Sequence, residues 1–190
     1  PQRPWGRVKL IFVAGAWGSG TTAVAGALAE LGVAAFGPHF QTSDPRTPNS
    51  FELVAFRDLV LRFVDERNIS FEATRSAALV ADLTIFRQAL EAGELGEWPA
   101  RGPKRLVLKL PVASLCLPQL AHVFDTTVIV VHRPLAEIEA SRVRRGWSAN
   151  LGAAGARAIY SKLFSDLTQL GLSNLGLSYR DITAEPERSM

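Results

Sequence analysis

The chain alternates short apolar runs with longer stretches in which apolar residues recur every three or four positions. A short continuous apolar run is typical of a strand buried on both faces, and the longer spacing is typical of an amphipathic helix. The strand candidates are residues 8–13, 105–110, 126–132 and 175–179. The helix candidates are residues 21–31, 51–66, 76–95, 114–124, 134–145 and 156–170. This order predicts an α/β fold of three layers, with a central, mostly parallel sheet flanked by helices.

Two polar stretches interrupt this alternation. Residues 37–50 are rich in Pro, Ser, Thr and Asn, and residues 93–103 contain several Gly and Pro, so we predict that both are loops. The sequence shows no internal repeat and no low-complexity tract that would mark a linker. A chain of 190 residues with 47% hydrophobic residues is long enough for one core, so we expect residues 1–190 to form a single domain.

Charge and cysteine content narrow the class of protein. The formal net charge is +3, from 21 basic and 18 acidic residues, and most of the basic residues are Arg, whose planar fork of donors suits phosphate and sulfate. No basic run exceeds two residues, so we expect no nucleic acid partner. Cys116 is the single cysteine, so no intrachain disulfide can form, and the apolar run 10–14 is too short to span a bilayer. We expect a cytoplasmic protein and see no membrane segment in this sequence.

The Gly-rich segment 15–22 carries the most chemistry, because it lies between a predicted strand and a predicted helix. In that setting backbone N–H groups and the helix N-terminus point at an anion, and Thr21 and Thr22 add hydroxyl donors. The spacing matches the P-loop pattern GxxxxGK[ST], except that Thr21 stands where Lys belongs. Since that Lys serves nucleoside triphosphates, its absence favours a nucleotide with a single 5′-phosphate group. The alternative is a Gly-rich turn with no ligand.

A second candidate anion site follows the most strand-like segment. Arg133 comes at the carboxyl end of that strand, where open α/β sheets bind ligands. Ser141 lies about two turns into the next helix, and helical spacing puts Arg145 on the same face. The alternative interpretation is a solvated helix whose Arg residues pair with Glu137 and Glu139.

These two segments together resemble the sulfotransferase family, which uses 3′-phosphoadenosine 5′-phosphosulfate (PAPS). Ser19-Gly20-Thr21-Thr22 is similar to the family's [RK]-S-G-T-T loop, which holds the 5′-phosphosulfate, and Arg133 with Ser141 eight residues later is similar to its 3′-phosphate site. Leu108-Lys109-Leu110-Pro111 and the segment 179–188 resemble two further family motifs. The resemblance covers roughly residues 8–188 and implies a P-loop-like fold. It assigns nucleotide contacts to Ser19, Gly20, Thr21, Thr22, Arg133 and Ser141. We add Trp17, Gly18 and Arg145 to the predicted nucleotide site because they lie in the same two segments.

The chain departs from the family at the basic residue of the loop, since Gly18 stands where Arg or Lys is usual. We expect Lys109, or Arg46 from the loop 37–50, to supply the missing charge. Trp17 and Trp147 lie in the expected nucleotide site, where stacking on adenine and ordinary packing are both open.

Sulfuryl transfer also needs a base, because the attacking hydroxyl or amine loses a proton. The resemblance to glycan sulfotransferases implies Glu52, at the start of the predicted helix 51–66 with Ser50 as its cap, and a carboxylate that only complements the helix dipole is the alternative. His39 is the second candidate.

The sequence thus predicts a PAPS-dependent sulfotransferase, with adenosine 3′,5′-bisphosphate as product and a small-molecule or glycan-like acceptor held by residues 37–50 and 93–103. No metal is expected, since no His, Cys, Asp or Glu group has ligand spacing. Two other classes stay open. One is a P-loop nucleotide kinase or NTPase, and the other is a non-catalytic nucleotide-binding module derived from a sulfotransferase.

Overall fold

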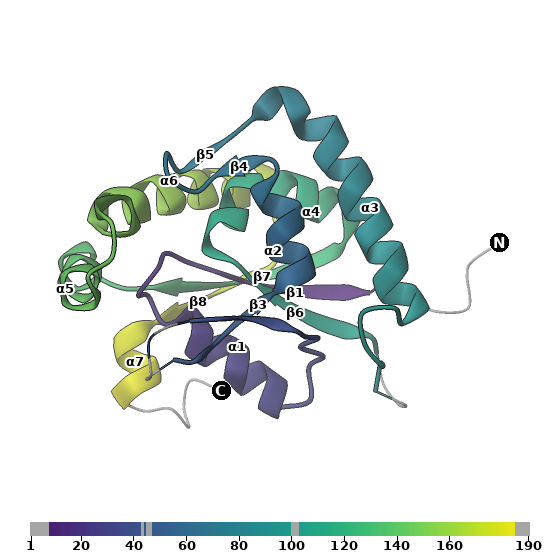
Figure 1. The fold of residues 1–190 in the computed structure, drawn as a ribbon, viewed down its shortest axis with the longest axis horizontal. Helices are drawn as coiled ribbons and strands as arrows, with labels where there is room; N and C mark the ends of the chain where they lie inside the picture. The colour runs from purple at the N-terminus through teal and green to yellow at the C-terminus, as the bar shows by residue number, and fades with distance from the viewer. Residues whose placement is uncertain (1–7, 43, 45–46, 100–102, 185–190) are drawn as a thin grey trace.

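The centre of the fold is a four-stranded sheet in which every neighbouring pair of strands runs parallel. The computed structural model describes residues 8–42, 44, 47–99 and 103–184 (Figure 1). In the order of the sheet, the strands are β6 (Arg105–Lys109), β1 (Lys9–Ala14), β7 (Asp125–His132) and β8 (Asn174–Ser178). Each corresponds to a strand expected from the sequence, and the predicted α/β fold with a central parallel sheet is confirmed.

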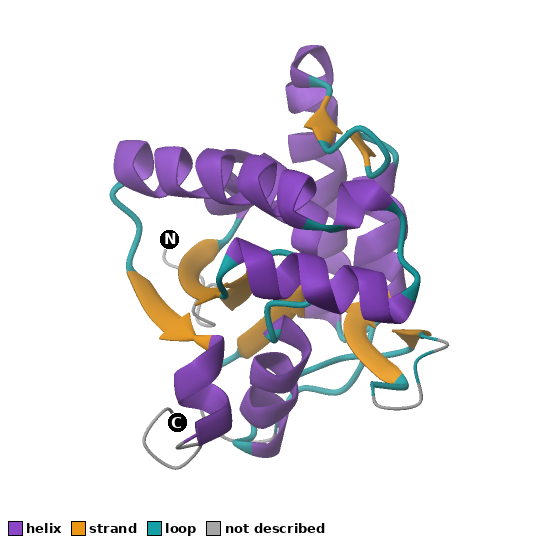
Figure 2. Cartoon of the chain, turned by 90° about the vertical axis from the view of Figure 1, so that its left-hand side faces the viewer, coloured by secondary structure: helices purple, strands orange, loops and turns teal. Residues whose placement is uncertain are grey.

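Helices cover both faces of this sheet, which gives the three predicted layers (Figures 1 and 2). Side chains of β1 alternate between two cores, because successive residues of a strand point to opposite faces. Leu10 and Phe12 pack in the larger core, and Val13 packs with Val24 in the smaller one. The helices on the larger core are α2 (Val54–Leu61), α3 (Ser76–Ala92), α4 (Leu117–Val123) and α6 (Ala153–Leu170), and α1 (Thr21–Glu30) covers the other face.

The apolar runs of the sequence become strands because these residues are buried on both faces. Phe12, Leu108 and Val128 lie on neighbouring strands, and their exposed fractions are 0%, 1% and 0%. Burying one such side chain stabilises the fold by about 1.5–3 kcal/mol. The central strands are therefore the most firmly held part of the molecule, and their carboxyl ends form a rigid base for the residues that follow them.

The remaining elements gather mainly at the carboxyl end of the sheet or form small hairpins. Helices α5 (Leu135–Arg145) and α7 (Tyr179–Ala184) directly follow β7 and β8. In the described part of the chain, short 3₁₀ helices cover Ala73–Arg75, Pro111–Cys116 and Ala149–Leu151. The two hairpins are β2 (His39–Gln41) with β3 (Asn49–Leu53), and β4 (Val64–Asp65) with β5 (Ser70–Phe71).

The predicted helix 51–66 is wrong at both ends. Ser50 does not cap a helix, because its Oγ donates to the Phe40 carbonyl (2.6 Å) and accepts from the N–H of Glu52 (3.1 Å). Residues 49–53 form a strand instead, and only Val54–Leu61 is helical. Glu52 therefore lies two residues before α2, and neither the predicted first-turn position nor the helix-dipole alternative holds for it.

The hairpin β2–β3 lies against α1, in a part of the chain that we expected to be a loop. Phe51 has a left-handed backbone (φ 56°), which costs about 1–3 kcal/mol for a bulky residue. Its ring fills the space beside Gly26 of α1, where a Cβ would lie 3.1 Å from Phe51 Cε2. The next residue, Glu52, contacts Lys109 at the end of β6. In the described part of the chain, no helix is both long enough and apolar enough to cross a membrane.

Candidate functional site

A cavity of about 610 Å³ lies at the carboxyl end of β6, β1 and β7. The parallel strands all end at this edge, so the segments that follow them meet there. The cavity is lined by most of the residues predicted from the sequence, namely Trp17, Gly18, Gly20, Thr21, Thr22, Glu52, Lys109, Arg133, Ser141 and Arg145. Ser19 is buried and its Oγ donates to the Ala16 carbonyl (2.7 Å), so it holds the loop rather than lining the cavity.

The Gly-rich loop has a geometry that only glycine adopts easily. Gly18 and Gly20 have φ angles of 73° and 102°, and a Cβ on Gly20 would lie 2.7 Å from Tyr179 Cδ2. Among the described residues, no side chain caps α1 at Gly20. The N–H of Ala23 already donates to the Gly20 carbonyl (3.0 Å), so the N–H groups of Thr21 and Thr22 are the first-turn donors left for a ligand. The loop and the positive end of the α1 dipole therefore present donors and charge that suit an anion at the cavity wall.

The backbone conformation at position 18 explains why glycine stands there in place of a basic residue. A φ of 73° is unfavourable for Arg or Lys, and a Cβ at Gly18 would lie 3.4 Å from Ser141 Cβ. That distance is an ordinary van der Waals contact, so the left-handed backbone, rather than a lack of space, disfavours a basic residue at position 18. Of the two residues expected to supply the charge, Lys109 lines the cavity and Arg46 lies outside the described residues.

Arg133 connects the loop to the second predicted anion site. Its NH1 donates both to the Gly18 carbonyl (3.0 Å) and to Ser141 Oγ (3.2 Å). Its guanidinium lies 4.0 Å from the centre of the Tyr179 ring and pairs with Glu137 (3.1 Å). Hydrogen bonds from Arg180 and then Arg133 hold the pKa of Glu137 below its usual value. Arg133 is thus held in one orientation between the two sites.

At the end of α5, the arginine that contacts Ser141 is not the predicted Arg145. Arg145 lines the cavity, but it pairs with Asp44 (3.2 Å) and covers the Trp147 ring (4.7 Å). Arg144 NH2 instead donates to Ser141 Oγ (3.0 Å). The sequence did not single out Arg144, although the i, i+3 spacing from Ser141 was a usable signal.

Another part of the cavity lining is a series of ion pairs among Lys109, Glu52, Arg57 and Glu66. Lys109 Nζ lies 2.7 Å from Glu52 Oε1, and both side chains are less than a tenth exposed. Arg57 NH1 contacts the other oxygen of Glu52 at 3.3 Å, and Arg57 also pairs with Glu66. The predicted catalytic residues Glu52 and Lys109 are therefore in direct contact. These two contacts use one lone pair on each oxygen of Glu52, so each oxygen can still accept a further hydrogen bond.

His39 lies outside this cavity. Its ring packs 5.2 Å from the Phe51 ring, on β2, and partial burial lowers its pKa. His39 is absent from the side chains that line the cavity with the Gly-rich loop. The indoles of Trp17 and Trp147 both line the cavity.

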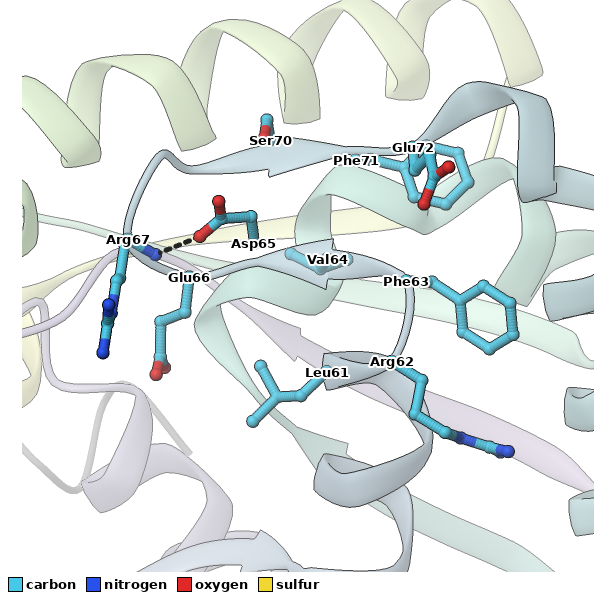
Figure 3. A pocket seen from close by; sticks show the side chains of 10 residues that line it. All are labelled: Leu61, Arg62, Phe63, Val64, Asp65, Glu66, Arg67, Ser70, Phe71 and Glu72. Atoms are coloured by element: carbon cyan, nitrogen blue, oxygen red, sulfur yellow. Dashed lines mark hydrogen bonds between the residues drawn. The ribbon is translucent and has the colours of Figure 1, made fainter.

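Of the predicted site residues, only Arg133 lines either of two other cavities in the described structure. One, of about 630 Å³, lies between the end of α2 and the hairpin β4–β5, where Asp65 accepts a hydrogen bond from the N–H of Arg67 (2.8 Å; Figure 3). The other, of about 570 Å³, lies beside α6 and shares Arg133 with the first cavity. Neither contains the Gly-rich loop, so the cavity at the carboxyl end of the sheet is the candidate site.

The described residues contain no cluster of three or more His, Cys, Asp or Glu side chains arranged to hold a metal ion. A scan of known protein families finds no model that matches the chain, and a search of curated proteins finds no match either.

Proposed function

We propose that this protein is a sulfotransferase that takes a sulfuryl group from PAPS and passes it to a hydroxyl or amine of an acceptor. The observation that carries the proposal is that the Gly-rich loop, the Arg133–Ser141 pair and the Glu52–Lys109 pair line one cavity. The first two are features that bind anions, and the third pairs an acid–base group with a cation. A sulfuryl transfer needs all three functions within reach of one another.

The residues present fit a nucleotide that carries phosphates on both sides of one ribose. The carbonyl of Gly18 accepts a hydrogen bond from Arg133, so the loop and the Arg133–Ser141 pair are adjacent. A 5′-phosphosulfate at the N-terminus of α1 and a 3′-phosphate beside Arg133 would use both. Thr21 in place of Lys argues against a triphosphate, because it removes the charge that meets the outer phosphates.

In the proposed reaction the acceptor oxygen or nitrogen bonds to sulfur while the bond from sulfur to the phosphate oxygen breaks. Glu52 takes the acceptor's proton on a lone pair that Lys109 and Arg57 leave open, and the loss of its negative charge weakens its hold on Lys109. A freed Lys109 then helps the N-terminus of α1 to balance the charge on the departing phosphate. The exchange of Lys109 between Glu52 and the phosphate would couple the two halves of the step.

The acceptor is expected on the side of the cavity formed by the hairpin β2–β3. Phe40, Gln41, Thr42 and Thr47 line that side and offer one aromatic face with several hydrogen-bonding groups. These groups suit a small molecule or a sugar, which combines hydroxyls with an apolar ring face.

Calorimetric titration with adenosine 3′,5′-bisphosphate, AMP and Mg-ATP tests the nucleotide. We expect the bisphosphate to bind most tightly, and preference for Mg-ATP would favour the kinase or NTPase class instead. Equal binding of the bisphosphate and AMP would refute the assignment of the 3′-phosphate to Arg133 and Ser141.

Transfer is tested by following the loss of labelled sulfate from PAPS with a panel of hydroxyl and amine acceptors. Glu52→Gln is expected to abolish transfer and to retain nucleotide binding, whereas His39→Gln is the matched control and should keep both. Unchanged turnover in Glu52→Gln would exclude Glu52 as the base. A wild-type protein that binds the bisphosphate but transfers to no acceptor would favour the non-catalytic class.

A further inference from the structure

The cationic side chains that line the cavity differ in whether a carboxylate neutralises them. Lys109 and Arg57 pair with Glu52, Arg133 pairs with Glu137, and Arg145 pairs with Asp44. Arg144 also lines the cavity, and it pairs with no carboxylate among residues 8–42, 44, 47–99 and 103–184. It therefore contributes a positive charge that the surrounding protein does not balance.

Arg144 and Arg133 meet at one buried hydroxyl. Ser141 is 2% exposed, and its Oγ accepts from Arg133 NH1 at 3.2 Å and from Arg144 NH2 at 3.0 Å. A serine hydroxyl has two lone pairs and one proton. Because the two guanidiniums use both lone pairs, Ser141 has only its proton to offer to a further partner. That partner must be an acceptor, and two guanidiniums beside it favour an anion.

The side chains of Arg133 and Arg144 differ in how many contacts hold them in place. Arg133 is held by Glu137, the Gly18 carbonyl and the Tyr179 ring, and its side chain is 15% exposed. Arg144 is exposed where it lines the cavity, and within the described part of the chain its guanidinium makes one hydrogen bond, to Ser141. Arg133 thus provides a fixed donor, and Arg144 can turn its remaining N–H groups toward an incoming ligand. Such a pair suits a phosphomonoester, whose dianion accepts several hydrogen bonds at once.

We propose that Arg144, and not Arg145, is the second cation of the site that holds the 3′-phosphate. The site then consists of Arg133, the proton of Ser141 and Arg144. Arg145 has a different role, since its ion pair with Asp44 joins the end of α5 to the segment after β2, and its guanidinium covers the ring of Trp147 just after α5. This inference rests on the proposed binding of a 3′-phosphorylated nucleotide.

The test compares binding of adenosine 3′,5′-bisphosphate with binding of AMP, which lacks the 3′-phosphate. Calorimetry gives the ratio of the two dissociation constants for the wild-type protein and for Arg144→Ala, Arg144→Lys and Arg145→Ala. We expect Arg144→Ala to weaken binding of the bisphosphate about 10-fold or more and to leave AMP unchanged, because a charge-assisted contact to one phosphate is lost. Arg144→Lys should recover part of the loss, and Arg145→Ala should keep the wild-type ratio.

Arg157→Ala is the matched control, since Arg157 is an exposed Arg of α6 that does not line the cavity. Its ratio should equal that of the wild type. An unchanged ratio in Arg144→Ala, or an equal loss for both ligands, would overturn the assignment of Arg144 to the 3′-phosphate. A wild-type protein with equal affinities would refute the proposed nucleotide itself, so the two failures are distinguishable. Thermal unfolding of each variant shows that the fold is retained.

Discussion

Replacing Lys109 by Met tests whether the Lys109–Glu52 pair stabilises the fold as a buried ion pair. The pair is 2.7 Å long and its side chains are 6% and 8% exposed, so water screens it little. Removing one partner of a buried pair typically costs about 3–5 kcal/mol, because the other charge is left without compensation. Here Arg57 still contacts Glu52 Oε2 at 3.3 Å and compensates part of its charge, so we expect a smaller cost than this, about 2–3 kcal/mol.

Urea denaturation measures this loss, and an unchanged slope shows that the unfolded state is the same. The double variant Lys109→Met/Glu52→Met completes a thermodynamic cycle, and we expect a coupling of at least about 1 kcal/mol because both charges are then absent. Arg62→Met is the control, since it breaks the exposed pair with Asp82 and should cost less than about 1 kcal/mol. If Lys109→Met costs no more than this control, the reasoning about burial is refuted.

Three further predictions concern single sites. Gly20→Ala should destabilise the protein by about 1–3 kcal/mol in urea, because position 20 has φ 102° and a Cβ there would lie 2.7 Å from Tyr179 Cδ2. Burial raises the pKa of the Cys116 thiol to about 12 from an ordinary value of 9.0, so the thiol stays protonated to a higher pH in the folded protein than in the unfolded chain. The thiol should resist thiol reagents at pH 8 until urea is added, and its contribution to stability, complete below about pH 9, should fall as the pH rises toward 12. Trp98→Phe should lower the melting temperature by a few degrees, since it removes the 2.7 Å bond to the Leu90 carbonyl, worth about 0.5–1.5 kcal/mol.

The sheet could be predicted because buried parallel strands leave a plain signal. The β-branched run 127–131 has no helical spacing and few polar positions, and β7 covers it fully. Residues 51–66 had no such signal, since apolar residues at helical spacing also occur where a strand, a helix and a hairpin follow one another. The position of Ser50 was wrong for the same reason, because its partner, the Phe40 carbonyl, is ten residues away and no local pattern reveals it.

The candidate site was predictable where backbone geometry or a strand end fixes it. The Gly-rich loop and Arg133 follow directly from β1 and β7, and the cavity contains both. The contact of Lys109 with Glu52 was not predictable, since 57 residues separate them and only the packing of β3 beside β6 brings them together. Helical spacing alone also gave the wrong choice between Arg144 and Arg145, because Asp44, from a distant segment, engages Arg145.

The anion surface of the Gly-rich loop is made of main chain, and this affects how the protein can change by mutation. Backbone N–H groups are the same for every residue type, so replacing Thr21 or Thr22 alters the loop's preference among ligands without deleting its donors. Gly18 and Gly20 are different, because their left-handed backbone fixes the path along which those donors point. Variation at the threonines is therefore expected to tune the ligand, and variation at the two glycines to remove the surface altogether.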